Sequence, residues 1–222
     1  MTPNTIRFNL EQVRKRISLA CLHANRPVEE VILIAVSKTV SASIIQTAYD
    51  LGVRDFGESR LQEAGSKVAA LAHLQPRPTW HMIGRLQSNK INAALESFDI
   101  IHSIDSVELA EAVNKRANRK IPVLLQVNVA AEASKSGFSL STINVAFQSI
   151  SQMPNLNIRG LMTIAPLVDN PEEVRPVFRQ LRNLRDSLNL EHLSMGMTHD
   201  FEVAIEEGAT MVRIGRAIFG ER

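Results

Sequence analysis

The chain has 222 residues, 45% of them hydrophobic, which is enough to fill one large core, and no Gly/Ser-rich linker divides it. Its 25 lysine and arginine residues nearly balance 23 acidic residues, and the net charge of +2 excludes a strong general attraction to nucleic acid or to an acidic membrane. The single cysteine, Cys21, excludes an internal disulfide, and no apolar run is long enough for a membrane helix, so we expect one soluble cytoplasmic domain covering residues 1–222.

Helices and strands are expected to alternate along the whole chain. Residues 6–24 carry apolar side chains at steps of three and four, which is typical of an amphipathic helix. The run VILIAVSK at residues 31–38 is apolar and rich in β-branched residues, which indicates a strand buried on both faces. Seven further strands are expected at residues 53–56, 79–83, 99–102, 121–129, 157–162, 192–194 and 210–214. Helices are expected between them near residues 41–51, 60–73, 88–95, 106–118, 141–153, 176–190 and 198–207.

Eight strands separated by helices are the count of a (β/α)8 TIM barrel, an α/β fold. Only GRAIFGER follows the last strand, which is too short for a full eighth helix. We therefore expect the N-terminal helix to cover that gap on the outside. A doubly wound open sheet is the alternative, because a strand count does not show closure.

The first strand leaves Lys38 at its carboxyl end. In a closed parallel barrel this end opens into the cavity where such folds place their chemistry, so Lys38 is the candidate for covalent attachment of a ligand. The other seven strands would end on the same mouth, at Gly57/Glu58, Gly84, Ser103, Asn128, Thr163, Ser194 and Gly215.

Two glycine-containing loops follow strands seven and eight, where barrels often bind phosphate. In SMGMTHDFE, Gly196 lets the chain bend, and Thr198 can cap the next helix or bind an anion. In VRIGRAIFG, the amides of Gly215 and Arg216 can donate to phosphate oxygens. Each loop alone is better explained as an ordinary turn and cap. Together with Lys38, the two loops predict a phosphate-anchored pocket for a Schiff base.

Arg213 lies two residues before Gly215, within an apolar strand. It faces either the barrel interior or the surrounding helices, where an unpaired guanidinium is costly. A cofactor ring nitrogen and an ordinary carboxylate are equally good partners for it.

Other charged and titratable residues have ordinary interpretations. The trio RKR at residues 14–16 and the arginines within residues 175–182 could contact phosphate, but solvated helix faces explain them better, so we expect no nucleic-acid partner. His81 and His102 lack an HxxxH partner or a cluster of carboxylates. We interpret them as hydrogen-bonded structural histidines and expect no metal site.

Several motifs in combination resemble a known family. They are AVSKT, DFGESRLQEA, WHMIGRLQSNK, HSIDS, QVNVAAEASKSGF, RGLMTIAP and LSMGMTHDFEVAIEEGATMVRIGRAIFG. In this order, from about Ala35 to Gly220, they resemble the YggS/PROSC family of pyridoxal phosphate homeostasis proteins. The resemblance implies a single barrel like the N-terminal domain of alanine racemase, with pyridoxal 5'-phosphate (PLP) held as a Schiff base on Lys38.

The same resemblance assigns the other cofactor-binding residues. Thr198 takes the place of the family's usual phosphate-binding serine, Gly215 and Arg216 supply amides to the phosphate, and Arg213 faces the pyridine nitrogen. Ser59 stands where many members have asparagine beside the cofactor, which shortens a polar contact. Arg216 stands where many have threonine, which keeps the amide but replaces a hydroxyl by a guanidinium.

We therefore expect a non-catalytic protein that holds PLP and hands it to apo PLP-dependent enzymes. We expect this protein to be a monomer. A racemase needs an acid/base group on each face of the substrate carbon, and in racemases with this barrel the opposing group is a tyrosine. The one tyrosine in this sequence, Tyr49, falls on a helix where packing explains it. A charged Arg213 would also leave the ring nitrogen unprotonated and the ring a poorer electron sink. The alternative is a slow PLP-dependent amino-acid racemase or lyase. Lys90 is the second candidate lysine, for transient transfer of the cofactor.

Overall fold

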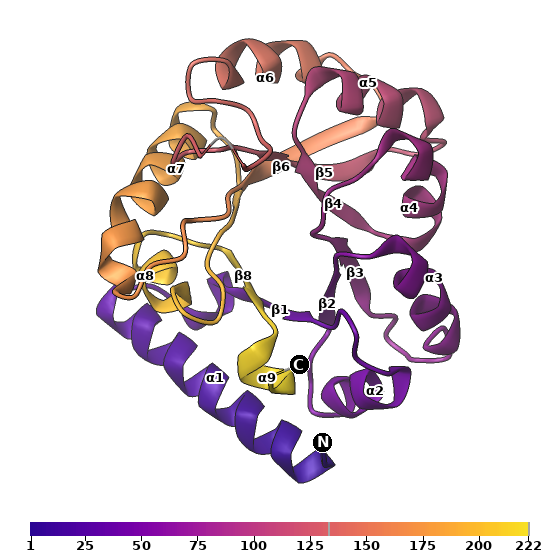
Figure 1. Ribbon diagram of the computed structural model, residues 1–222, viewed down its shortest axis with the longest axis vertical. Helices are drawn as coiled ribbons and strands as arrows, with labels where there is room; N and C mark the ends of the chain where they lie inside the picture. The colour runs from indigo at the N-terminus through magenta and orange to yellow at the C-terminus, as the bar shows by residue number, and fades with distance from the viewer. Residues whose placement is uncertain (133, 222) are drawn as a thin grey trace.

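A computed structural model of the protein describes residues 1–132 and 134–221. Within these ranges eight parallel strands form one closed barrel in chain order, and the last strand pairs with the first (Figure 1). The predicted (β/α)8 barrel is confirmed, and the open sheet is excluded. Ala133, which belongs to the motif QVNVAAEASKSGF, and Arg222 lie outside the described residues.

The strands follow the predicted order. They are β1 (Ile32–Val36), β2 (Asp55–Glu58), β3 (Thr79–Met82), β4 (Ile100–Ile104), β5 (Ile121–Gln126), β6 (Leu156–Met162), β7 (His192–Ser194) and β8 (Met211–Ile214). The largest difference at a strand end is in β5, which ends three residues before the predicted Val129. The physical reason is a competing partner, because the loop residue Phe138 pairs through its backbone with Gln126 and Asn128.

Helices surround the barrel (Figure 1). They are α1 (Pro3–His23), α2 (Ala42–Asp50), α3 (Leu61–Ala70), α4 (Ile91–Ser97), α5 (Val107–Arg116), α6 (Ile143–Ser151), α7 (Arg175–Ser187), α8 (Phe201–Glu206) and α9 (Arg216–Phe219). Short 3-10 turns at η1 (Val28–Glu30), η2 (Ser88–Lys90) and η3 (Pro171–Val174) precede β1, α4 and α7. None of the helices in the described part of the chain has the length and apolar character needed to cross a bilayer.

The N-terminal helix α1 completes the outer layer, as predicted. It lies along α8 and α9, where the short α9 leaves the barrel uncovered (Figure 1). Its buried side chains recur at helical spacing: Ile6, Leu10, Val13, Ile17, Ala20 and Cys21. Cys21 is therefore part of the core, and burial raises the pKa of its thiol.

Two helix-end predictions on α2 have different outcomes. Gly52 follows the helix with φ of +90°, the left-handed conformation predicted for its C-terminal end. Ser41 occupies the N-cap position, but its hydroxyl contacts the Ser43 hydroxyl at 3.0 Å and caps no backbone amide. Tyr49 on this helix is buried and donates its hydroxyl to the Pro76 carbonyl at 2.9 Å, so its role is structural.

The arginine row on α7 is paired with carboxylates, so the interpretation as a purely solvated face is wrong. Glu207, at the end of α8, accepts hydrogen bonds from Arg179 at 2.7 Å and forms an ion pair with Arg182 at 3.1 Å. Arg175 lies 3.3 Å from the same carboxylate and 2.6 Å from Glu206. This network joins α7 to α8, the helix that follows the loop after β7.

Lowering the pH should weaken the ion pairs that join α7 to α8. Burial raises the pKa of the Glu207 carboxyl, but the hydrogen bonds and charges of the three arginines outweigh it and hold the pKa below its usual range. Such a group stabilises the fold above its unfolded pKa of about 4.3 and loses that contribution as the pH falls through the folded value. Glu207→Gln should therefore cost about 1–2 kcal/mol of unfolding free energy at pH 7 and flatten its acid dependence, measured by urea unfolding.

That estimate is below the value for a fully buried pair because the arginine side chains are between 23% and 54% exposed. Glu111→Gln on α5 is the control, since Glu111 is exposed and has no ion-pair partner within the described residues. Equal losses in the two variants would contradict a specific contribution from Glu207.

Candidate functional site

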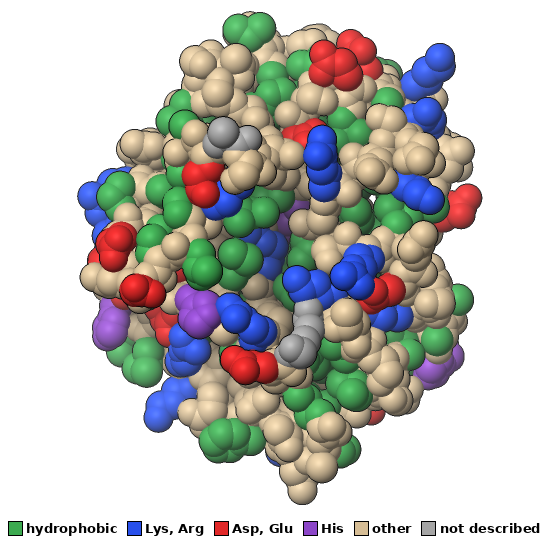
Figure 2. Space-filling model, viewed as in Figure 1, with side chains coloured by type: hydrophobic (Ala, Val, Ile, Leu, Met, Phe, Trp, Pro, Cys, Tyr) green, Lys and Arg blue, Asp and Glu red, His purple; other side chains and the backbone are tan. Residues whose placement is uncertain are grey.

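A cavity of about 710 Å³ opens at the carboxyl ends of the strands. Figure 2 shows the hollow in the middle of this face, with lysine and arginine side chains at its edge. The residues lining it include all six that the sequence predicted as cofactor ligands: Lys38, Ser59, Thr198, Arg213, Gly215 and Arg216. The fold therefore brings together Arg213 of β8 and residues from the loops after β1, β2, β7 and β8, and their ligand roles stay predictions.

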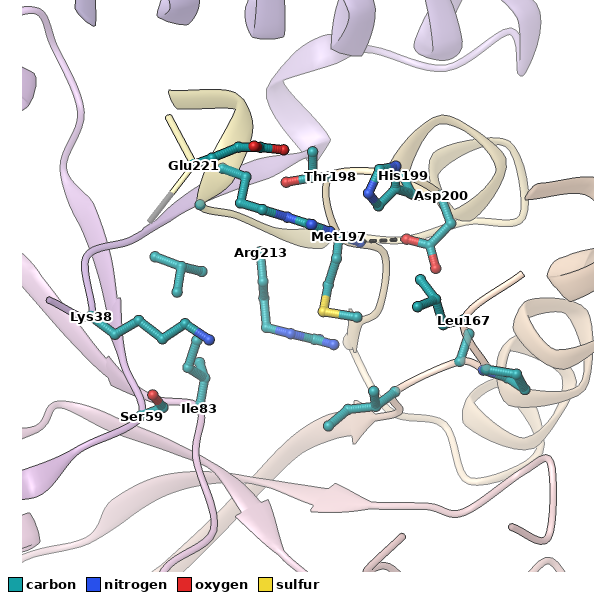
Figure 3. A pocket seen from close by; sticks show the side chains of 16 residues that line it. Lys38, Ser59, Ile83, Leu167, Met197, Thr198, His199, Asp200, Arg213 and Glu221 are labelled. Carbon is teal, nitrogen blue, oxygen red and sulfur yellow. Dashed lines mark hydrogen bonds between the residues drawn. The ribbon is translucent and has the colours of Figure 1, made fainter. Parts of the chain in front are cut away.

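Lys38 extends into this cavity from the turn after β1. Figure 3 shows its amine directed across the cavity, on the side of Arg213. Lys38 is exposed, and its amine makes no hydrogen bond or ion pair with any residue of the described ranges. It is therefore free to react with a ligand that enters the cavity.

A buried ion pair holds the residue before Lys38. The Ser37 hydroxyl donates to Glu58 Oε1 at 2.7 Å, and the Lys67 amine donates to the same oxygen at 2.7 Å and to the Ser37 carbonyl at 2.8 Å. Burial raises the pKa of Glu58, against the hydrogen bonds from Lys67 and Ser37. Glu58 Oε2 is a buried oxygen without a hydrogen-bond partner among the described atoms.

A second contact holds the residue after Lys38. Thr39 has a left-handed backbone, with φ of +65°, and its amide donates to Glu63 Oε2 at 2.8 Å. This hydrogen bond is the main reason that the pKa of Glu63 lies below its usual range. The turn that carries Lys38 is thus anchored on both sides, by α3 and the end of β2. Sequence reasoning missed these anchors, although the i, i+4 pair Glu63 and Lys67 signals a charged face on α3.

Arg213 is buried in the barrel interior and reaches the floor of the cavity (Figure 3). Its partners are neutral: Nη1 donates to the Ser194 hydroxyl at 2.7 Å, and Nη2 donates to the Thr163 carbonyl at 2.8 Å. Burial lowers the pKa of Arg213 to about 10, while the charge of Asp200 acts in the opposite direction. Within the described residues no carboxylate pairs with Arg213 directly. Of the two partners expected from the sequence, the structure therefore excludes a directly paired carboxylate among these residues.

The loop after β7 presents Thr198 at the cavity from a tight turn. Helix α8 begins at Phe201, three residues later than predicted, so Thr198 does not cap it. The reason is Asp200, whose carboxylate accepts the Met197 amide at 2.6 Å and closes the turn before the helix. Gly196 has φ of +90°, a conformation that residues with a side chain rarely adopt.

Helix α1 supports this turn from outside the barrel. Arg16 pairs with Glu202 at 2.5 Å, donates to the Thr198 carbonyl at 3.4 Å and lies over the Phe201 ring. One member of the basic trio is therefore a structural contact of the cavity loop, and it is not merely solvated.

The loop after β8 runs directly into the short helix α9. Arg216 is the first residue of this helix, and the Ile218 and Phe219 amides donate to the Gly215 carbonyl. Amides at the start of a helix have no partner within it, so those of Gly215 and Arg216 can serve an anion in the cavity. Gly215 has φ of −114°, so its backbone is not left-handed. A glycine matters at this position because it has no side chain.

The structure also adds cavity residues that the sequence had not assigned as ligands. Five are apolar and three are titratable, and Figure 3 shows Ile83 beside Lys38 and Ser59, with Met197 and Leu167 on the other side of the cavity. They are Ile83, Ile164, Pro166, Leu167, Met197, His199, Asp200 and Glu221. Lys90 does not line this cavity. It lies in a neighbouring pocket that shares Ser59 with it.

The two histidines are hydrogen-bonded, as predicted. His81 Nδ1 lies 2.9 Å from His102 Nε2, and His81 Nε2 lies 3.0 Å from its other partner, Asp55 Oδ1. No group of three or more potential metal ligands occurs within residues 1–132 and 134–221.

Comparisons with known proteins assign the family. The family described as alanine racemase, N-terminal domain, matches residues 7–222. A pyridoxal phosphate homeostasis protein of Aquifex aeolicus is 46% identical over 222 residues, covering 96% of both chains. The chain belongs to the pyridoxal phosphate homeostasis protein family.

Two solved structures are similar to the chain, one in sequence and fold and the other in fold. PipY of Synechococcus elongatus, solved with PLP bound, is 40% identical, with a TM-score of 0.81 over 94% of this chain and 100% of its own. Alanine racemase of Corynebacterium glutamicum is 17% identical, with a TM-score of 0.74 over 99% of this chain and 61% of its own. The second likeness shows the fold alone, and it confirms the predicted similarity to the alanine racemase barrel.

Proposed function

We propose that this protein binds PLP in the cavity at the carboxyl ends of the strands and serves PLP homeostasis without robust catalysis. The observation that carries the proposal is the free Lys38 amine, which shares one cavity with the Arg213 guanidinium and with the loops after β7 and β8. Family membership supports it, since the relatives are named for PLP homeostasis and PipY was solved with PLP bound.

The donor groups of the cavity fit the parts of PLP. An aldehyde needs an amine, which Lys38 offers, and bound PLP supplies that aldehyde for reversible bonding to the amine. The phosphate needs several donors, which the Thr198 hydroxyl and the amides of Gly215 and Arg216 offer. A pyridine nitrogen accepts a hydrogen bond, which the Arg213 guanidinium can donate. Ser59 lies beside Lys38 and lines the same wall (Figure 3).

The carrier role is favoured over catalysis for two reasons. Tyr49, the one tyrosine in the sequence, is buried against Pro76 and does not line the cavity. Arg213 keeps its proton at neutral pH and so disfavours a protonated ring nitrogen opposite it. A slow racemase or lyase is the alternative, and we expect no α-deuterium exchange above background with a panel of amino acids.

The experiment is a titration of the apo-protein with PLP, followed by mixing with an apo PLP-dependent enzyme. We expect one PLP per chain, seen by absorbance, and recovery of activity by the recipient. We further propose that residues 1–222 act as a single cytoplasmic domain and as a monomer, which size-exclusion chromatography with light scattering tests. Absence of PLP binding would contradict the proposal, and rapid amino-acid turnover would favour the enzyme alternative.

A further inference from the structure

Five polar side chains form a continuous hydrogen-bonded chain inside the barrel. It begins at Arg213, whose Nη1 donates to the Ser194 hydroxyl at 2.7 Å. Ser194 Oγ lies 2.9 Å from His102 Nδ1, and His102 Nε2 lies 2.9 Å from His81 Nδ1. The chain ends at Asp55, whose Oδ1 is 3.0 Å from His81 Nε2. Strands β8, β7, β4, β3 and β2 contribute one residue each.

This chain crosses the barrel from one end to the other. Its middle is enclosed, with Ser194 and His102 at 0% exposure and His81 at 2%. The Arg213 end lines the main cavity. The Asp55 end is partly exposed and lines a second cavity, of about 420 Å³, at the amino ends of β1 and β2.

The two ends impose one direction on every hydrogen bond between them. A guanidinium only donates and an ionised carboxylate only accepts. Ser194 therefore accepts a hydrogen bond from Arg213, and its own hydroxyl donates a hydrogen bond to His102 Nδ1. With both histidines neutral, His102 and His81 each carry their proton on Nε2, and His81 donates to Asp55. All four hydrogen bonds are then satisfied by a single arrangement of protons.

The charge of Arg213 benefits from this arrangement. A buried guanidinium without a directly paired carboxylate is costly, and its pKa is lowered by burial. Hydrogen bonds that all point the same way polarise one another and stabilise a positive charge at the donor end. Burial is the main reason that the pKa of His102 lies well below its usual range, and the charge of Arg213 acts in the same direction, so His102 is neutral, as the chain requires.

We propose that this chain, from Asp55 to Ser194, positions Arg213. Its members keep the guanidinium charged and aimed into the cavity, where it opposes the ring nitrogen of PLP. Among the described residues, Ser194 and the Thr163 carbonyl are the two hydrogen-bond acceptors of the guanidinium, so Ser194→Ala would leave one of them. The inference rests on the proposed PLP-binding function, but the direction of the chain can be tested without PLP.

The first test uses the apo-protein labelled with ¹⁵N. Long-range NMR correlations of the ring nitrogens should show the proton on Nε2 of both His81 and His102. Ser194→Ala removes the donor to His102 Nδ1 and should shift the resonance of that nitrogen. Ser97→Ala, at a buried hydroxyl of α4 outside the chain, should leave both histidines unchanged. A proton on Nδ1 of His102 in the unaltered protein would overturn the proposed direction.

The second test measures PLP binding. Ser194→Ala should weaken it about tenfold and shift the absorbance maximum of the bound cofactor, because one hydrogen bond to a charged group is lost. Asp55→Asn keeps an acceptor for His81 but removes the charge, and we expect a loss of about threefold with the same direction of spectral shift. Ser97→Ala should match the unaltered protein in both affinity and spectrum.

The outcomes separate this inference from the proposed function. Unchanged affinity and spectrum in both Ser194→Ala and Asp55→Asn would overturn the positioning role. Because Asp55 lies at the partly exposed end, Asp55→Asn keeps the test decisive even where Ser194→Ala does not fold. Failure of the unaltered protein to bind PLP would contradict the proposed function instead, and the apo-protein NMR result would still decide the direction of the chain.

Discussion

Replacing Lys38 by alanine should abolish covalent attachment of PLP and leave the barrel intact. The side chain is exposed and makes no hydrogen bond or ion pair with the described residues, so its removal takes no contact from the core. The turn itself is held by other groups, namely the Ser37 hydroxyl and the Thr39 amide. Borohydride reduction followed by peptide mass spectrometry should find PLP on Lys38 in the unaltered protein and no stable label in the variant.

Lys90→Ala is the matched control. Lys90 lies in the neighbouring pocket, so its removal should leave the label on Lys38 unchanged. Thermal unfolding should give the same midpoint for both apo-variants and the unaltered protein. A label that stays at full yield in Lys38→Ala would assign attachment to another lysine and contradict the proposed site.

Replacing Gly160 by alanine should cause the largest loss of stability among the changes considered. A Cβ at this position would lie 2.0 Å from the His192 carbonyl oxygen and 2.6 Å from its carbon. Gly160 and His192 are register partners of β6 and β7, so the clash falls on backbone and no side chain can rotate away. We expect a loss of about 3 kcal/mol or more in unfolding free energy, measured by urea unfolding.

Gly65→Ala tests the same change where space is available. Gly65 lies within α3, and among the described residues outside this helix a Cβ there would come within 4 Å of Ser97 Oγ alone, at 3.9 Å. Alanine is favoured over glycine in a helix by about 0.8–1.0 kcal/mol, so this variant should be slightly more stable. A similar loss in both variants would contradict the steric explanation at Gly160.

The strands and helices were predictable because their signals are local. The apolar run at residues 31–38 marks a strand buried on both faces, and the spacing at residues 6–24 marks an amphipathic helix. Errors arise where a side chain makes a competing hydrogen bond, as Asp200 does when it accepts the Met197 amide and closes the turn at Thr198 ahead of α8. No periodicity reports such a competing side chain.

Some features of the candidate site were predictable from local sequence, and others were not. Lys38 and the loops after β7 and β8 follow from strand ends, because all the strands of a parallel barrel end on one face. Ser194 and Thr163 were expected at strand ends as well, but their pairing with Arg213 was not predicted, since they lie 19 and 50 residues away from it in the sequence. His102 and Ser194 are 92 residues apart, and no motif links them.

The sequence by itself determined the order of the elements, the lysine at the end of β1 and the glycine-containing loops that face it. These depend on residue types and short-range spacing. Only the tertiary structure decided that β8 closes on β1, that the arginines of α7 pair with the carboxylates of α8, and that Arg213 joins a hydrogen-bonded chain. Such contacts depend on strand register and on the direction of side chains inside a closed barrel, which the local pattern of residues does not contain.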